Sequence, residues 1–387
     1  MNGRPWGAQH HLQVIQLRTA FVMEQTLGHV THFQNLRAAA ARQSDVLPTW
    51  LPIPFGTTPL ERLLPAYRAN WSIRASVRAR RRLATELSKQ EHHALFFHTQ
   101  VTALFSSRLM QRLPSIISLD ATPLNYDSIA AAYGHRPASD SWLDGRKHAL
   151  NREAFHAAAA LVTWSEWAKS SLIRDYQVAA ERVTVIAPGA SRGFFTIGKD
   201  RTSRSARAEG PVRLLFVGAD FVRKGGPLLL ESAKQARTAR AFELHIVTQQ
   251  PIEPMAGVIV HRGLQPNSPE LMRLFAEADA FILPSYGDCL PLVLMESSAA
   301  ALPSIATSVG AMAEAAVSGR TAITIAPGDG RSLRSAIEAM VDNEELRARY
   351  GAAAYALARA RLDAERNGQQ ILDLLRSIAR PAGQRAA

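Results

Sequence analysis

The amino-acid sequence predicts an α/β protein that consists of two domains of parallel strands and helices. The chain has 387 residues, enough for two domains that each bury a core. Short apolar runs that end in Gly or Pro turns alternate with helix-compatible segments in both halves of the chain. Between the halves, residues 196–211 are rich in Ser, Arg, Gly and Lys, as linkers are. We therefore expect a first domain over residues 1–195, a linker over 196–211 and a second domain over 212–387.

Composition is typical of a globular protein and limits its partners. Apolar residues make up 47% of the chain and charged residues 20%, and no long apolar run predicts a membrane-spanning helix. No secretory leader is visible, and the lone Cys289 allows no intramolecular disulfide, so we expect a cytoplasmic protein. The net charge of +12 favours acidic partners, which include nucleotide sugars, anionic lipid surfaces and nucleic acid.

The first predicted strand, residues 19–24, leads into a turn that contains Gly28 and His29 and then into a helix. A glycine at such a turn lets the backbone approach a ligand closely, and an ordinary strand-to-helix turn is the alternative.

The next two predicted strands, residues 94–98 and 115–119, end at His98 and Asp120. Polar residues at the carboxyl ends of parallel strands lie on the edge of the sheet where ligands bind. A purely structural role is the alternative for His98. The sequence contains no Asp-x-Asp triplet and no Cys/His spacing that suits zinc, so we expect no metal site.

Residues 62–82 contain seven arginines, and Trp71, Ile73, Val77 and Leu83 recur among them at helical spacing. A basic amphipathic helix with a tryptophan favours an anionic membrane surface as a partner. The alternative is a solvated helix whose apolar side packs on its own domain. We expect no nucleic-acid binding, because no ladder of stacking aromatic residues accompanies the charge.

In the second domain, a predicted strand at residues 213–217 ends at Gly218 and is followed by Arg223, Lys224 and two further glycines. Two cations at a strand-to-helix turn can neutralise a diphosphate, with Lys acting as a point charge and Arg as a fork.

A second buried strand, residues 280–283, is followed by a helix over residues 291–301. Asp288 precedes this helix and Glu296 lies about two turns inside it, with seven residues between them. Two acids so placed suit a long polyhydroxylated ligand better than a closely spaced acid/base pair.

The acid pair and the residues after it resemble the E-x7-E region of the retaining GT-B glycosyltransferases of family 4, the glycosyl transferases group 1. The matching residues after the pair are Leu302-Pro303, Val309-Gly310, Glu314, Gly319 and Pro327-Gly328-Asp329. The chain departs from the family pattern at four places, which makes it an atypical member. Where the family pattern has Glu, Gly-Phe-Gly, His and Arg, this chain has Asp288, Cys289-Leu290-Pro291, Leu119 and Ala219, respectively.

The resemblance implies a GT-B fold, in which two Rossmann-like domains face each other across a cleft and the C-terminal helix crosses back to the first domain. It implies retaining transfer of a sugar from a nucleoside diphosphate sugar to an acceptor, without a metal or another cofactor. Asp288, Cys289 and Leu290 would contact the sugar, Glu296 the ribose, and Gly218, Arg223 and Lys224 the diphosphate. The catalytic set would be Arg223, Lys224, Asp288 and Asp120, and Gly28, His29 and His98 would form the acceptor or phosphate loop.

Two other functions remain open at this point: a nucleotide-sugar binding protein without turnover and, from charge alone, a basic nucleic-acid binder. If residues 62–82 bind lipid, the protein would lie at the inner face of the membrane.

Overall fold

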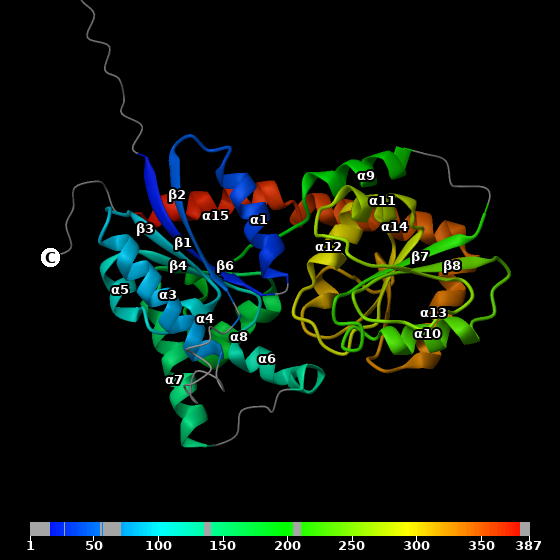
Figure 1. Ribbon diagram of the computed structural model, residues 1–387, viewed down its shortest axis with the longest axis horizontal. Helices are drawn as coiled ribbons and strands as arrows, with labels where there is room; N and C mark the ends of the chain where they lie inside the picture. The colour runs from blue at the N-terminus through cyan, green and yellow to red at the C-terminus, as the bar shows by residue number, and fades with distance from the viewer. Residues whose placement is uncertain are drawn as a thin grey trace, which may run out of the picture.

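The computed structural model describes residues 16–26, 28–54, 56, 71–134, 141–203 and 210–379, which form two α/β domains side by side (Figure 1). Each domain has one six-stranded parallel sheet, and the predicted two-domain α/β fold is confirmed. The first sheet has the order β2-β1-β3-β4-β5-β6. Its strands are β1 (Leu17–Gln25), β2 (Val46–Pro54), β3 (Ala94–His98), β4 (Ser115–Leu119), β5 (Ala160–Thr163) and β6 (Val183–Val185).

Helices cover both faces of the first sheet. On one face pack α1 (His29–Ala40) and α15 (Ala364–Ile378), whose apolar side chains share a core with Phe21 and Phe96. The other face is covered by α3 (Trp71–Leu87), α4 (Gln100–Ala103), α5 (Ser107–Arg112), α7 (Trp142–Ala157) and α8 (Glu166–Tyr176). The last described helix, α15, therefore lies on the first domain.

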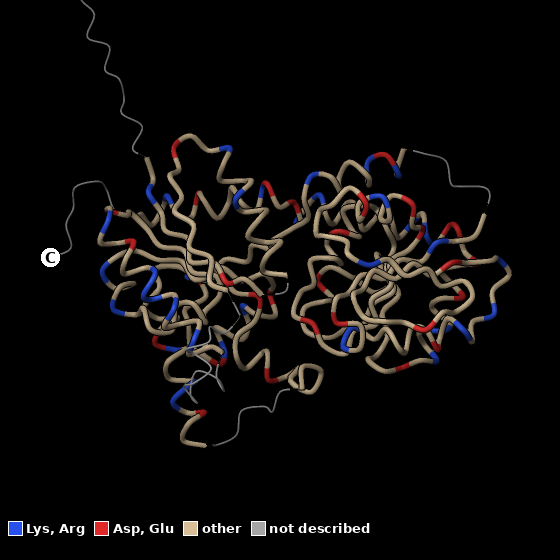
Figure 2. The backbone as a smooth tube through the Cα atoms, in the orientation of Figure 1, with Lys and Arg blue, Asp and Glu red and all other residues tan. Residues whose placement is uncertain are grey.

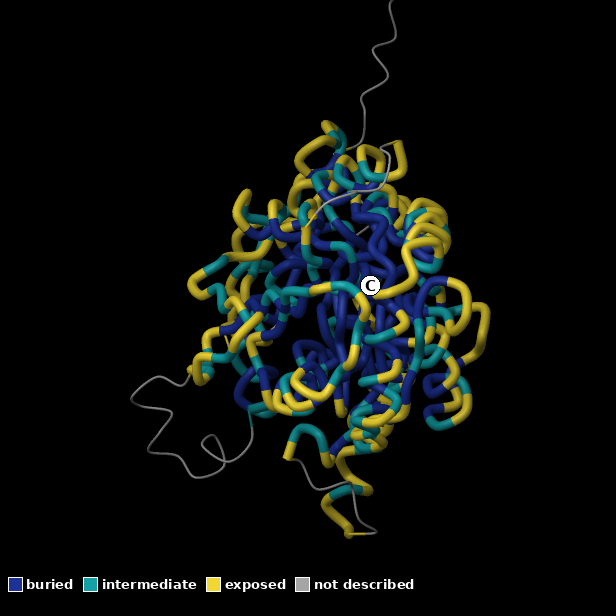
Figure 3. Tube along the Cα trace, turned by 90° about the vertical axis from the view of Figure 1, so that its right-hand side faces the viewer, coloured by how far each residue is buried: buried dark blue, intermediate teal, exposed yellow. Residues whose placement is uncertain are grey.

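The second sheet has the order β12-β11-β10-β7-β8-β9. Its strands are β7 (Val212–Val217), β8 (Phe242–Val247), β9 (Val258–His261), β10 (Ala280–Leu283), β11 (Ser304–Thr307) and β12 (Ala322–Ile325). Helices α10 (Gly226–Gln235) and α13 (Gly330–Asp342) contact each other, and α12 (Leu292–Ala299) contacts α9 (Arg192–Ser203) and α14 (Glu344–Arg361). The remaining helix, α11 (Pro269–Glu277), packs on α9. In Figure 3 the buried strands form the centre and exposed turns surround them.

The edge strand β2 is not predicted by the sequence pattern. Its sequence, VLPTWLPIP, contains three prolines, which have no N–H group for a sheet ladder. β2 pairs only with β1 in this sheet, and an edge strand tolerates proline because one of its sides makes no ladder.

The predicted linker is helical in its first half. Residues 196–203 belong to α9, and Phe194, Phe195 and Ile197 attach this helix to the core of the second domain. At Gly198 a Cβ would lie 2.1 Å from the carbonyl oxygen of Ala299, so the glycine allows α9 and α12 to pack closely. Lys199 and Ser203 face outward, whereas Arg201 donates to the carbonyl oxygens of Ala300 and Phe275 at 3.0 and 2.8 Å. The polar residues that indicated a linker thus belong to a helix that packs on its domain. Residues 204–209 lie outside the described residues.

Helix α3 packs its apolar side on the first domain, as the solvated-helix alternative requires. Ala79 and Leu83 are fully buried in the core, and Trp71 is half-buried against it rather than exposed as an interfacial anchor. Arg62 and Arg68 lie outside the described residues. None of the described helices combines the length and the apolar composition that crossing a bilayer requires.

Candidate functional site

The second sheet reverses its strand order between β7 and β10, so the turns that follow these two strands meet at one edge. Gly218 follows β7, and a Cβ there would lie 2.6 Å from Cδ of Lys224, so the glycine leaves room for the lysine stem. Gly225 has a φ of +78°, and a Cβ there would lie 2.1 Å from the carbonyl oxygen of Pro284 after β10. These glycines let the turn that carries Arg223 and Lys224 lie directly against the turn that carries Asp288.

Both cations contact the carboxylate of Asp288. Lys224 Nζ lies 2.9 Å from Oδ2 and Arg223 Nη1 lies 3.2 Å from Oδ1, while the Ser285 hydroxyl donates to Oδ2 at 2.9 Å. Burial opposes ionisation of Asp288, but the charges of Lys224 and Arg223 and these hydrogen bonds outweigh it and lower its pKa. The sequence pattern predicted Arg223, Lys224 and Asp288 in one site, and the structure places them in contact. The pattern did not predict that Asp288 itself binds both cations, where an anionic ligand would bind.

A segment of the first domain covers Arg223 from the opposite side. The guanidinium carbon lies 4.5 Å from the ring centroid of Tyr133, and Nη1 also donates to the Tyr133 hydroxyl at 3.2 Å. Tyr133 ends a short 3-10 helix, η2 (Ala130–Tyr133), which follows α6 (Pro123–Ser128). At Gly287, a Cβ would lie 2.5 Å from Cβ of Ala132. The cleft is therefore closed at this point, and sequence reasoning missed Tyr133 because it belongs to the other domain.

Glu296 differs from Asp288 in having no partner. It lies on α12 and is only 7% exposed, and no hydrogen bond or ion pair is made by its side chain to any described residue. Burial raises its pKa from 4.5 to about 7. A buried carboxylate without a partner is costly unless a ligand hydroxyl donates to it, so Glu296 is suited to bind a polyhydroxylated ligand.

The two residues after Asp288 are also buried. Gly310, with a φ of +54°, packs on the carbonyl oxygen of Asp288, and the amide of Ala311 donates to the carbonyl oxygen of Cys289 at 2.8 Å. Burial raises the pKa of the Cys289 thiol, and the carboxylates of Asp120 and Asp288 raise it further. The thiol is thus neutral, and Asp120 of the first domain lies next to it across the cleft.

The first sheet reverses its strand order between β1 and β3, and the predicted acceptor-loop residues meet there. His98 Nδ1 faces the carbonyl oxygen of Ser118 at 3.2 Å and must donate to it, so Nε2 of His98 is an acceptor. His29 Nδ1 lies 2.7 Å from this Nε2 and donates to it. In the neutral ring, Nε2 of His29 therefore carries the lone pair, and it lies 3.8 Å from Oδ2 of Asp120. Gly28 contacts the second domain, since a Cβ there would lie 3.1 Å from Leu292.

Two buried aromatic side chains with unpaired nitrogens complete this cluster. Both ring nitrogens of His32 and Nε1 of Trp164 are buried and have no hydrogen-bond partner among the described residues. Burial and the neighbouring His29 lower the pKa of His32 to about 3, and burial lowers the pKa of His98 well below its usual value. The inner histidines are thus neutral at ordinary pH. Nothing in the sequence around His32 or Trp164 distinguished them from ordinary core residues.

Glu314 joins the two domains at the other side of the cleft. Its carboxylate accepts hydrogen bonds of 3.0 Å from the backbone amides of Glu166 and Trp167, at the N-terminus of α8. A carboxylate at this position satisfies free amides and interacts favourably with the helix dipole. Arg361, at the end of α14, lies 3.8 Å from the same carboxylate.

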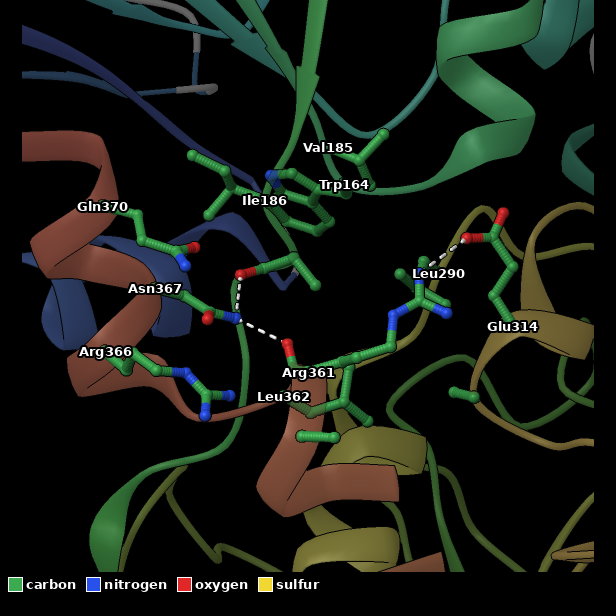
Figure 4. Close-up of a pocket in the computed structure, with 13 residues that line it drawn as sticks. Trp164, Val185, Ile186, Leu290, Glu314, Arg361, Leu362, Arg366, Asn367 and Gln370 are labelled. Atoms are coloured by element: carbon green, nitrogen blue, oxygen red, sulfur yellow. Dashed lines mark hydrogen bonds and ion pairs between the residues drawn. The ribbon is translucent and has the colours of Figure 1, made fainter. Parts of the chain in front are cut away.

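Beside Glu314 lies a pocket of about 160 Å³ between the domains (Figure 4). Asn367 on α15 ties its wall together by donating to the carbonyl oxygens of Ala187 and Arg361 at 2.9 and 2.8 Å. Of the predicted donor-site residues, only Leu290 lines this pocket. The turns around Lys224 are closed instead by Asp288 and Tyr133. In the described part of the chain, no group of three or more His, Cys, Asp or Glu side chains is arranged to hold a metal ion.

Two doubly wound sheets that meet across a cleft at their switch points define the GT-B class of folds. Sucrose-phosphate synthase from Thermosynechococcus elongatus has this fold, with a TM-score of 0.69 and 16% identity over 94% of this chain and 99% of that one. HepE from Anabaena, solved with UDP and glucose, has a TM-score of 0.65 and 15% identity over 94% and 100%.

The sequence comparisons point to the same class. Residues 211–343 match the family described as glycosyl transferases group 1. This part of the second domain therefore carries the group 1 sequence pattern, and the two domains together have the GT-B fold. D-inositol 3-phosphate glycosyltransferase of Corynebacterium diphtheriae is 28% identical over 246 residues, 58% of each chain. Glycogen synthase of Mycobacterium tuberculosis is 28% identical over 221 residues, 52% of this chain and 51% of that one. The chain thus spans about half the length of these curated relatives.

Proposed function

We propose that the protein transfers a sugar from a nucleoside diphosphate sugar to an acceptor hydroxyl. The observation that carries the proposal is the buried Glu296, which has no partner among the described residues and lies on the helix after the turn where Asp288 contacts two cations, within a domain of group 1 sequence. Glu296 would accept hydrogen bonds from the ribose hydroxyls. Lys224 and Arg223 would bind the diphosphate, with which Asp288 now competes. The structure of HepE with UDP and glucose supports a nucleotide-sugar ligand for this fold.

In the proposed reaction the bond between the anomeric carbon and the diphosphate oxygen breaks, and the diphosphate leaves with the bonding electrons. Lys224 and Arg223 stabilise the negative charge that develops there. Asp288 turns from the cations to the sugar hydroxyls once the diphosphate occupies them. The acceptor oxygen forms the new bond on the face that the diphosphate leaves, so the anomeric configuration is retained. Because the two cations neutralise the leaving group, we expect transfer to survive a metal chelator.

His29 is suited to take the proton that the acceptor hydroxyl loses. Its hydrogen bond to His98 leaves the lone pair on Nε2, and Asp120 beside that atom would stabilise the imidazolium that forms. The family pattern places a histidine where this chain has Leu119, and His29 supplies an imidazole at the same edge of the sheet.

The first test is a thermal-shift screen of nucleoside diphosphate sugars. A ligand at 100 times its dissociation constant stabilises the folded state by about 2.7 kcal/mol, which such a screen detects. With the best donor, release of the diphosphate and NMR of the product then report transfer and its stereochemistry. Inversion of the anomeric centre would contradict the mechanism. No stabilisation by any member of the panel would contradict the proposed ligand class.

A binding protein without turnover is the second candidate, and one observation favours it: Asp288 neutralises both cations and Tyr133 covers one of them. Slow hydrolysis of the donor in water separates the two, because a binder would protect the donor and a transferase would release the diphosphate.

A further inference from the structure

Helix α7 projects from the lower edge of the first domain, and only its second half is part of the core (Figure 1). Ala154 and Phe155 are buried against the first sheet. At the other end, Trp142 is 74% exposed and Leu143 is 63% exposed, the two most exposed large apolar side chains of the described residues. Leu150, two turns further along, is 37% exposed. The start of α7 therefore carries apolar side chains that contribute nothing to the core.

Lys and Arg outnumber Asp and Glu along this helix and its neighbours α3 and α5 (Figure 2). Helices α3, α5 and α7 pack on the same face of the first sheet, α5 contacts α7, and α4 contacts both α3 and α7. Of the acids on α3, α5 and α7, Glu153 is exposed, and Glu86 and Asp144 are half-buried, with Asp144 paired to Lys147 at 3.0 Å. The exposed cations are Arg80, Arg81, Arg82, Arg108, Arg112, Arg146, Lys147 and Arg152. The guanidinium carbon of Arg146 lies 5.5 Å from the ring centroid of Trp142.

We propose that the start of α7 and the basic faces of α3 and α5 dock the protein on an anionic lipid bilayer. Trp142 and Leu143 enter the interfacial region, where an amphipathic indole is most stable, and the surrounding cations contact the head groups. Two apolar side chains among many cations suit a bilayer better than a protein partner, because a stable protein interface needs a larger continuous apolar centre. The docking element differs from the one expected from the sequence, since Trp71 faces the core and Trp142 faces solvent.

The position of this surface next to the cleft would bring a membrane-borne acceptor close to the donor site. Helix α6 leads from the first domain towards the second (Figure 1), and its Leu124 is 37% exposed. The short helix η2 comes next in the chain and packs against Gly287 of the second domain. A bilayer under α7 would thus lie near the mouth of the cleft. An acceptor hydroxyl carried by a lipid could reach the donor without leaving the membrane, and this second step rests on the proposed transfer.

The test is co-sedimentation of the full chain with vesicles of phosphatidylcholine alone and with about 30% phosphatidylglycerol, without donor or acceptor. The double variant Trp142→Ala/Leu143→Ala removes the apolar tip, and both residues are too exposed for their loss to unfold the domain. The matched control is Leu47→Ala/Ile259→Ala, which removes two exposed apolar side chains from other elements. A third variant, Arg146→Gln/Arg152→Gln, removes two positive charges. The loss of each charge is expected to weaken binding to the anionic vesicles by about fivefold.

We expect wild type and control to bind the anionic vesicles, and the apolar-tip variant to bind at least about tenfold more weakly. The charge variant should lose affinity by about 25-fold, and wild-type binding should fall steeply between about 0.1 and 0.5 M NaCl. Equal binding to neutral vesicles, or unchanged binding of the apolar-tip variant, would overturn the proposal. So would a single-stranded oligonucleotide that binds wild type but not this variant and displaces the vesicles, because the surface would then recognise nucleic acid. Because no donor is present, failure here leaves the proposed transfer standing.

Discussion

Substitution of Glu296 by Gln should stabilise the protein and weaken its ligand binding at the same time. In the folded state, burial raises the pKa of Glu296 from 4.5 to about 7, so the folded protein holds this proton more tightly than the unfolded chain. The stability that this provides is fully present below pH 4.5 and is lost as the pH rises through 7. At about 1.36 kcal/mol per pH unit, the ionised carboxylate costs about 3 kcal/mol at pH 8.

The glutamine keeps the shape of the side chain and removes the charge. Urea unfolding followed by fluorescence should therefore show Glu296→Gln about 3 kcal/mol more stable than wild type at pH 8, with most of this difference gone at pH 5. Glu181→Gln, an exposed carboxylate, is the matched control and should change stability little at either pH. Calorimetry with a nucleoside diphosphate should show the opposite trend, with weaker binding to Glu296→Gln because an acceptor for the ribose hydroxyls is lost. A variant that is less stable at pH 8, or equally stabilised at both pH values, would refute the reasoning.

Four other substitutions separate the proposed roles. Lys224→Ala should lower turnover by roughly 10²–10³-fold, and unchanged steady-state rates in the folded variant would remove this residue from the mechanism. Asp288→Asn should bind the nucleoside diphosphate at least as tightly as wild type, because the carboxylate that contacts both cations is gone, but should transfer sugar more slowly. Calorimetry that shows the same loss as in Glu296→Gln would contradict this division of roles. His29→Gln should lower turnover by about 10²-fold without changing donor affinity, whereas an equal loss of donor affinity would assign it to the donor site. Glu314→Ala should weaken the contact between the domains by about 1 kcal/mol, visible in calorimetric unfolding, and a single unshifted transition would speak against it.

The sequence predicted a strand correctly where a short apolar run between helix- and strand-breaking residues marks it. The predicted strands at 94–98, 115–119 and 280–283 coincide with β3, β4 and β10, because each is a short apolar run between breaking residues. β2 was not predicted, since prolines in a strand are tolerated only at a sheet edge, and edge position depends on the whole sheet. For helix α3, the sequence pattern predicted an amphipathic helix. It could not predict whether the apolar side of the helix contacts a membrane or the core of the first domain.

For the site, the sequence by itself determined which residues meet at the edge of the second sheet. Arg223, Lys224 and Asp288 lie in turns that follow strand ends, and Glu296 lies within the helix that one of these turns leads into. In a parallel sheet such positions converge regardless of the loops between them. Only the tertiary structure decided what each side chain contacts. Lys224 binds an acid 64 residues away, Arg223 is covered by Tyr133 from 90 residues away, and Glu296 has no partner in the described chain. Pairing and burial fix the charge state of each group, and both depend on atoms that packing brings together from distant parts of the sequence.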